Sequence, residues 1–215
     1  MREDREIRMF EIKRTAGYFS LMGVRTFCAA VLVTIGMYLY RYLLFGKDSF
    51  GGAASILLLD AAMLQVMLFS MFLNYSMLLI RLVISFGSTR REALWGPNIM
   101  FAVYVILSAC LYLILASIHR QARSGVIWFL ISAFLTGAMS QLMAYLEMRT
   151  GDRKLIFVAT LVLGMGIAMV TINGEFVLSL PGGMLRIVAL VGAFLVFMLT
   201  SIPMRHHIRH MDLRV

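Results

Sequence analysis

Long apolar runs separated by short polar connections dominate the pattern of this chain. A helix needs about 20 apolar residues to span a bilayer, and six stretches reach or approach that length. They are residues 22–45, 54–86, 99–118, 126–146, 155–172 and 184–202. The pattern predicts an all-α, polytopic membrane protein with six transmembrane helices. The fifth is the weakest prediction, because it is short and contains Gly164 and Gly166.

The second run is too long for a simple crossing. It holds roughly 33 residues and would extend about 50 Å as a helix, against a hydrocarbon core of about 30 Å. We expect this helix to tilt, to break near Asp60, or to project beyond the bilayer.

Composition supports a single membrane domain. Hydrophobic residues make up 61% of the 215 residues and charged residues 14%, whereas soluble domains are about half apolar and a quarter charged. We divide the chain into a polar amino-terminal segment (1–21), a six-helix membrane domain (22–203) and a basic tail (204–215). The amino-terminal segment pairs opposite charges at i,i+4 spacing and predicts a short solvated or interfacial helix.

The net charge of +9 is spread over the connections between apolar runs rather than gathered on one surface. Nucleic-acid binders gather Lys and Arg on a continuous surface, so we do not expect a nucleic-acid partner. Cytoplasmic segments of membrane proteins are enriched in Lys and Arg. With both termini inside, only Lys47, Arg120 and Arg123 fall on outer connections. We therefore expect both termini to be cytoplasmic, in a cell membrane.

The connection between the second and third runs, "SFGSTRREALWGPN", is unlike the others. Thr89 and Glu92 form a T-x-x-E capping box, which starts a helix. Gly96 and Pro97 end a helix in the usual way, and Asn98 is a plausible N-cap for the third span. The spacing predicts a short separate helix here, and a positively charged anchor with Trp95 at the headgroups is the open alternative.

This stretch resembles the loop between the second and third helices of six-helix permeases of ABC-type exporters with short cytoplasmic loops. The six spans, the cytoplasmic ends and the polar amino-terminal segment also resemble that family. In such transporters a short coupling helix docks into a groove of a separate ATP-binding subunit. The resemblance implies a docking role for nine residues: Gly87, Ser88, Thr89, Arg90, Arg91, Glu92, Leu94, Trp95 and Gly96.

The resemblance assigns these residues three roles. Arg90, Arg91 and Glu92 would make polar contacts with the ATP-binding subunit, Leu94 and Trp95 would enter its groove, and the glycines would allow the bends. The chain has no phosphate-binding loop, since the single Gly–Lys pair at Gly46 lacks the required flanking residues. ATP and Mg would therefore bind the partner subunit, and we expect no cofactor and no catalytic residue here.

Polar residues within the runs are functional candidates because they are costly in lipid. At 100° per residue, Asp60, Ser70, Asn74 and Arg81 fall within an arc of about 80° on the second helix. They predict a face that lines a translocation path or meets another subunit, while hydrogen bonding to neighbouring helices is the plainer alternative. Glu175, between the fifth and sixth runs, is a candidate outer-gate residue by resemblance.

On the fourth helix, Ser132, Thr136, Ser140 and Glu147 share a face, which predicts close helix packing. His206 and His210 have metal-binding spacing but no third ligand, so we expect the basic tail to meet anionic headgroups instead. Cys28 and Cys110 define neither a disulfide framework nor a metal site.

Three functions remain in view. The first is a permease subunit that pairs with an identical or related permease and moves amphipathic, peptide or lipid-like cargo. The second is the solute-binding membrane component of a vitamin-type importer, although the Ala-x-x-x-Ala face of that class is missing around Ala29 and Ala30. The third is an intramembrane enzyme, for which we see no Ser–His pair or facing carboxylates.

Overall fold

The computed structural model describes residues 2–45, 53–74, 90–118, 125–150 and 183–210. Five helices fill these ranges, and no strand occurs within them: α1 (Arg2–Phe45), α2 (Ala53–Asn74), α4 (Arg90–Ile118), α5 (Gly125–Thr150) and α8 (Gly183–His210). For some helical residues, among them 2–15, 53–60 and 90–94, the backbone alone is described. The all-helical prediction is confirmed, while the predicted fifth span at 155–172 lies outside the described residues.

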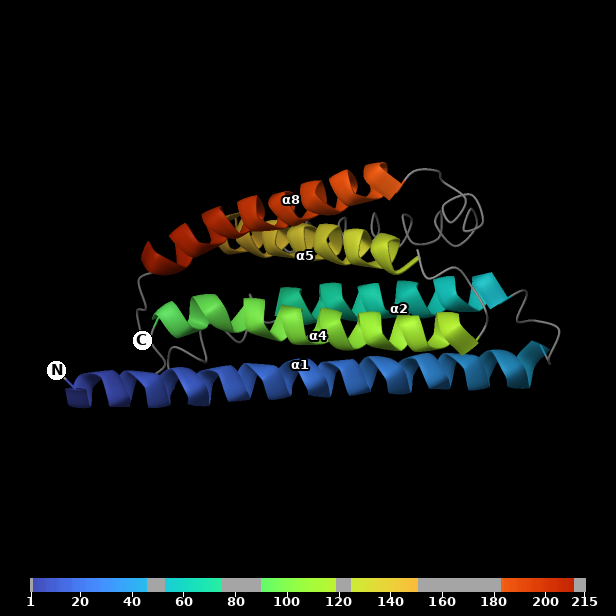
Figure 1. Ribbon diagram of the computed structural model, residues 1–215, viewed down its shortest axis with the longest axis horizontal. Coiled ribbons are helices and arrows are strands. Elements are labelled where there is room, and N and C mark those ends of the chain that lie inside the picture. The colour runs from blue at the N-terminus through green and yellow to red at the C-terminus, as the bar shows by residue number, and fades with distance from the viewer. Residues whose placement is uncertain (1, 46–52, 75–89, 119–124, 151–182, 211–215) are drawn as a thin grey trace.

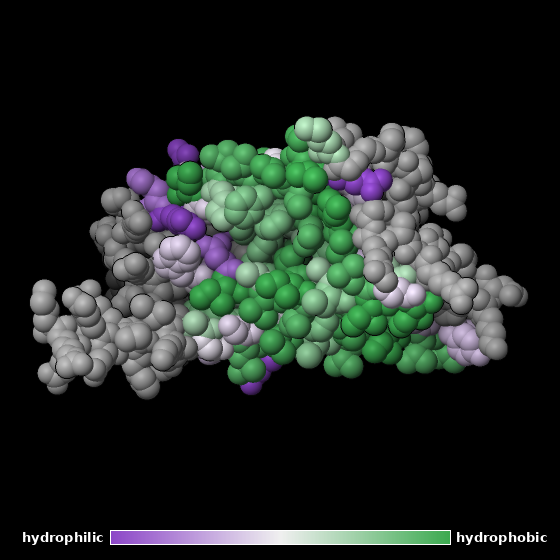
Figure 2. Space-filling view, viewed as in Figure 1, coloured by the Kyte–Doolittle hydropathy of each residue, from purple (hydrophilic) through white to green (hydrophobic). Residues whose placement is uncertain are grey.

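Four of the described helices are long and apolar enough to cross a membrane. The qualifying stretches are Ala16–Leu44, Trp95–Ile118, Gly125–Thr150 and Arg186–Pro203. In α2 the stretch Ala61–Met71 is apolar but shorter. Hydrophobic residues cover the middle of the surface in Figure 2, and hydrophilic residues gather toward the ends of the described bundle. This is the distribution that a lipid environment requires.

The helices lie side by side, and their ends sort into two groups (Figure 1). Arg2, Asn74, Arg90, Thr150 and His210 lie at one end, whereas Phe45, Ala53, Ile118, Gly125 and Gly183 lie at the other. Helices α5 and α8 therefore run in the same direction, and Thr150 and Gly183 are at opposite ends of the bundle.

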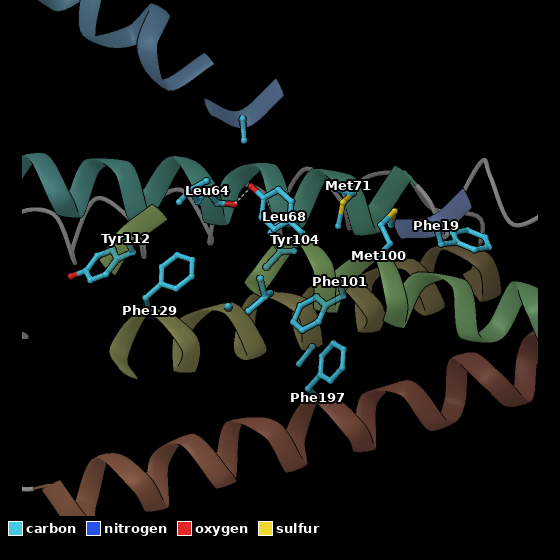
Figure 3. Packing of buried hydrophobic residues seen from close by; sticks show 14 of the residues in the cluster. Phe19, Leu64, Leu68, Met71, Met100, Phe101, Tyr104, Tyr112, Phe129 and Phe197 are labelled. Atoms are coloured by element: carbon cyan, nitrogen blue, oxygen red, sulfur yellow. Dashed lines mark hydrogen bonds between the residues drawn. The ribbon is translucent and has the colours of Figure 1, made fainter. Parts of the chain in front are cut away.

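Packing pairs helices that are distant in the sequence. Helix α1 packs mainly on α4, and α5 packs on both α8 and α2. The core shown in Figure 3 is aromatic, with Phe101 stacked on Phe197 at 4.5 Å and Tyr112 stacked on Phe129 at 5.7 Å between ring centroids. Gly137 lies directly against Phe101 and Phe197, so its missing side chain makes room for the first of these stacks. Small residues that allow close approach are the usual basis of helix association in lipid.

Three boundaries differ from the sequence expectations. The amino-terminal segment is not a separate short helix, because α1 continues from Arg2 through the first span to Phe45. Helix α2 does not break near Asp60, since it is continuous from Ala53 to Asn74. Helix α8 passes through Pro203 and continues to His210, so the first residues of the predicted tail are helical.

The prediction of a separate short coupling helix is also wrong. Residues 90–95 form the first turns of α4, which continues through Gly96 and Pro97 to Ile118. The predicted N-cap, Asn98, lies inside this helix. Proline removes one backbone hydrogen bond from a helix, but spanning helices tolerate it where neighbouring helices support them. Here α1 packs along α4 and supplies that support.

Candidate functional site

The start of α4 is the candidate docking segment, and the structure makes it the end of a spanning helix. The described part of the helix begins at Arg90, and the Thr89–Glu92 capping box stays a prediction because Thr89 lies outside the described residues. Because the same helix continues through the core to Ile118, a displacement of its first turns moves the spanning part with them. A separate short helix joined by a bend would transmit less of that motion.

Trp95 is the best-defined side chain of this segment. It is 55% exposed, although it belongs to a helix whose inner face carries the buried residues Met100 and Tyr104. The guanidinium carbon of Arg205, near the end of α8, lies 5.4 Å from the centroid of the Trp95 ring. This is a cation–π distance. The contact joins the start of α4 to the end of α8, and part of the indole stays accessible to a partner.

Gly96 fixes the position of this segment against α1. A Cβ atom at Gly96 would overlap the ring of Phe19, which is itself buried. Four residues further along α1, a Cβ atom at Gly23 would lie 2.9 Å from the carbonyl oxygen of Met100. The two glycines let α1 and α4 approach closely along this seam. Gly96 is therefore a packing residue, whereas the resemblance made it a bend.

Several predicted docking residues cannot be placed. Gly87, Ser88 and Thr89 lie outside the described residues. Arg90, Arg91, Glu92 and Leu94 are helical, but their side chains are not described. The cluster that the structure defines is therefore Trp95, Gly96, Phe19 and Arg205. Trp and Arg are common anchors in protein–protein interfaces, and Trp is also enriched at the membrane–water interface, so the docking role and the headgroup-anchor role both stay predictions.

The predicted polar stripe on α2 is only partly visible. Ser70 is exposed, while Asp60 and Asn74 are helical residues whose side chains are not described. Arg81 and the candidate gate residue Glu175 lie outside the described residues. Ser70 is thus exposed rather than buried in the described core. Its assignment to a translocation path or a subunit interface stays a prediction.

Sequence reasoning missed Gln65, which is buried in α2. Gln65 is 5% exposed, and its Nε2 donates to Ser132 Oγ at 3.0 Å and to the Phe129 carbonyl at 3.3 Å on α5. Its Oε1 has no hydrogen-bond partner. Nearby, the hydroxyl of Tyr104 on α4 donates to the Leu64 carbonyl at 2.8 Å (Figure 3). The sequence did contain one signal for this residue. Gln65 is an amide within an apolar run, and it lies on a different side of the helix from the predicted polar stripe.

The hydroxyl face of α5 serves packing, as predicted for Ser132, Thr136 and Ser140. Thr136 and Ser140 are buried, and Ser140 donates to the Phe69 carbonyl of α2 at 3.3 Å. On another side of α5, Gln141 accepts a hydrogen bond from Thr200 of α8 at 3.1 Å. Interhelical hydrogen bonds of this kind hold spanning helices together. Helix α5 is thus bonded to both α2 and α8.

Within the described residues, no group of three His, Cys, Asp or Glu side chains is placed to hold a metal ion. His206 is exposed near the end of α8, and the His210 side chain is not described. Cys28 and Cys110 are both exposed on the outer surface of the described bundle.

Comparison with known proteins does not place the chain in a family. No family model, no curated protein and no solved structure matches it.

Proposed function

We propose that this chain is the membrane-spanning permease subunit of an ATP-driven ABC-type exporter. The observation that best supports this function is the architecture of α4. Its first turns carry the exposed Trp95, and its continuation forms part of the core through Met100 and Tyr104. A partner that binds the start of α4 would move the spanning helices directly. This is the mechanical requirement for an ATPase that lies outside the membrane.

The direction of the helices supports a six-span topology. Arg2 and His210 lie at one end, together with the start of α4. The opposite placement of Thr150 and Gly183 fits one further crossing between them, for which the sequence offers residues 155–172. The distribution of Lys and Arg favours the cytoplasmic side of a cell membrane for this shared end. A cytoplasmic ATP-binding subunit would have access to that end.

The proposed assembly contains two permeases and two ATP-binding subunits, embedded in the lipid bilayer. ATP and Mg would bind only the ATP-binding subunits, and the permease would carry no catalytic residue. The exposed face of α2 at Ser70 is where the second permease or the cargo would contact this chain. Cargo would be amphipathic, peptide or lipid-like, because the second run that carries the predicted path face is mostly apolar. ATP binding would favour one of two states through their different contacts.

The test is purification of the chain from its native membranes together with bound proteins. We expect an ATP-hydrolysing protein with a phosphate-binding loop to be retained, and to be lost from the double variant Arg91→Glu with Trp95→Ala. The matched control is Arg123→Glu with Ile118→Ala, which makes the same kind of change toward the other end of the bundle. Equal retention by both double variants would refute docking at α4. A chain that retains no ATPase but binds one small solute tightly would be the importer component instead.

A further inference from the structure

The contact between Trp95 and Arg205 extends the docking site beyond α4. We infer that Arg205 ties the end of α8 to the docking end of α4, so that the ATP-binding subunit moves both helices when it engages Trp95. This inference rests on the proposed function and adds a second helix to the surface on which the partner acts. In it, Arg205 is a positioning residue that works through Trp95.

The geometry supports a tie between the helices rather than an incidental contact. The Arg205 guanidinium carbon is 5.4 Å from the indole centroid, and Arg205 is itself partly buried. At the next residue along the chain, α4 is held by the Phe19–Gly96 contact with α1. Trp95 therefore stands between the seam with α1 and the end of α8. Movement of the Trp95 indole would therefore displace the Arg205 guanidinium, which belongs to α8.

Hydrogen bonds from α8 to its neighbours would transmit a displacement of Arg205 to other helices of the bundle. Five residues before Arg205, α8 is bonded to α5 through Thr200 and Gln141. Helix α5 is in turn bonded to α2 through Ser140 and the Phe69 carbonyl. A pull at Arg205 thus reaches α5 and α2 without passing along α4. Rigid elements joined by hydrogen bonds are the physical means by which such coupling travels.

The chemistry of the partner follows from that of the contact. The indole offers an apolar surface, and a guanidinium over an aromatic face keeps the N–H groups at its edge free to bind carboxylates. The groove of the ATP-binding subunit should therefore have an apolar floor for Trp95 and acidic residues on the side toward α8.

The experiment uses the complete complex, purified with its ATP-binding subunit and reconstituted in lipid. Cys28 and Cys110 are replaced by serine, and an environment-sensitive fluorophore is attached to Ile114→Cys on α4 or to Ile202→Cys on α8. Both positions are exposed. ATP with vanadate is then added to trap the closed state. We expect the trapping signal at both labels in the otherwise unchanged complex.

Arg205→Gln is expected to retain the partner and the α4 signal while its α8 signal is reduced, because the cation–π contact between α8 and Trp95 is lost. Arg205→Lys should preserve most of the α8 signal because it keeps the cation. Arg149→Gln, which removes an exposed cation from the end of α5, is the matched control and should change neither signal.

Two failures are distinguishable. If the unchanged complex contains no ATP-binding subunit, the proposed function fails and this inference fails with it. If the subunit is present and Arg205→Gln leaves the α8 signal intact, the tie between α8 and Trp95 is overturned while docking at α4 stands. Loss of both signals in Arg205→Gln, with the partner still bound, would also overturn the tie, because α4 should respond without it.

Discussion

The hydroxyl of Thr200 on α8 donates a hydrogen bond to the side-chain oxygen of Gln141 on α5, at 3.1 Å between heavy atoms. Gln141 is 2% exposed, so in a membrane the amide has few alternatives to this partner. The bond links two parallel helices in a region where packing is otherwise aromatic and aliphatic. It explains how α8, whose surface is largely exposed and apolar, keeps a defined position along α5.

A double-mutant cycle should measure this bond. We expect Gln141→Ala and Thr200→Ala to be coupled by about 0.6–1.7 kcal/mol in the free energy of unfolding, the range found for interhelical hydrogen bonds in membranes. The control is Ser117→Ala, since the Ser117 hydroxyl bonds only within its own helix to the Leu113 carbonyl. Unfolding in detergent gives the values. Full additivity of the two changes would show that the bond does not hold α8 on α5.

Gly96 should be intolerant of any side chain. Gly96→Ala places a methyl group into the Phe19 ring, and overpacking of this kind costs about 1–3 kcal/mol. We expect Phe19→Leu to restore part of the loss, because it removes the clash. Gly36→Ala on α1 is the control, since nothing lies within 4 Å of its Cβ position. Gly36→Ala should be neutral or stabilising by up to about 1 kcal/mol, because alanine has the higher helix propensity. Equal effects of the two alanines would contradict the close seam between α1 and α4.

Gln65 should be replaceable by an apolar residue of similar size. One of its two polar atoms, Oε1, is buried without a partner, and apolar replacement of a buried polar group can be neutral or stabilising. We expect Gln65→Leu to change the free energy of unfolding by less than about 1 kcal/mol, in either direction. Gln65→Ala should lower it by about 1–3 kcal/mol, because it leaves a cavity. A loss in Gln65→Leu as large as in Gln65→Ala would mean that the bonds to α5 dominate.

Cysteine labelling tests the orientation of the bundle. The end of α1 and the start of α4 lie at opposite ends, so Lys47→Cys and Arg91→Cys should be accessible from opposite sides of the membrane. Cys28 and Cys110 are first replaced by serine. The charge distribution predicts that an impermeant maleimide labels Lys47→Cys in intact cells and labels Arg91→Cys only after disruption. Labelling of both from the same side would contradict the arrangement of the helices, whereas the reverse result would contradict only the orientation.

The sequence was most informative where a single physical rule decides the outcome. Hydrophobic length predicts a helix over each described apolar run, and a helix is found over each. It was least informative where local signals conflict with packing. Gly96 and Pro97 resemble a helix end, yet α4 continues through them because α1 packs against Gly96. Turn propensities contain no term for a neighbouring helix.

Side-chain partners were the second weak point. Angular counting grouped four polar residues of the second run on one face, but it could not determine which side of the helix meets the core. Ser70 is exposed, and Gln65, off the stripe, is buried. The contact of Trp95 with Arg205 had no sequence signal at all, since it joins two helices that are far apart along the chain. Such pairs become visible only when the helices are placed in space.

The pairing of distant helices sets the order in which the bundle can close during synthesis. Helix α1 enters the membrane first among the described helices, but its main packing partner, α4, follows only after α2. Helix α5 must likewise keep Gln141 in lipid, or against a temporary neighbour, until α8 has been made. A nascent chain that stops before α8 therefore lacks the hydroxyl group that bonds to the Gln141 amide in the complete bundle.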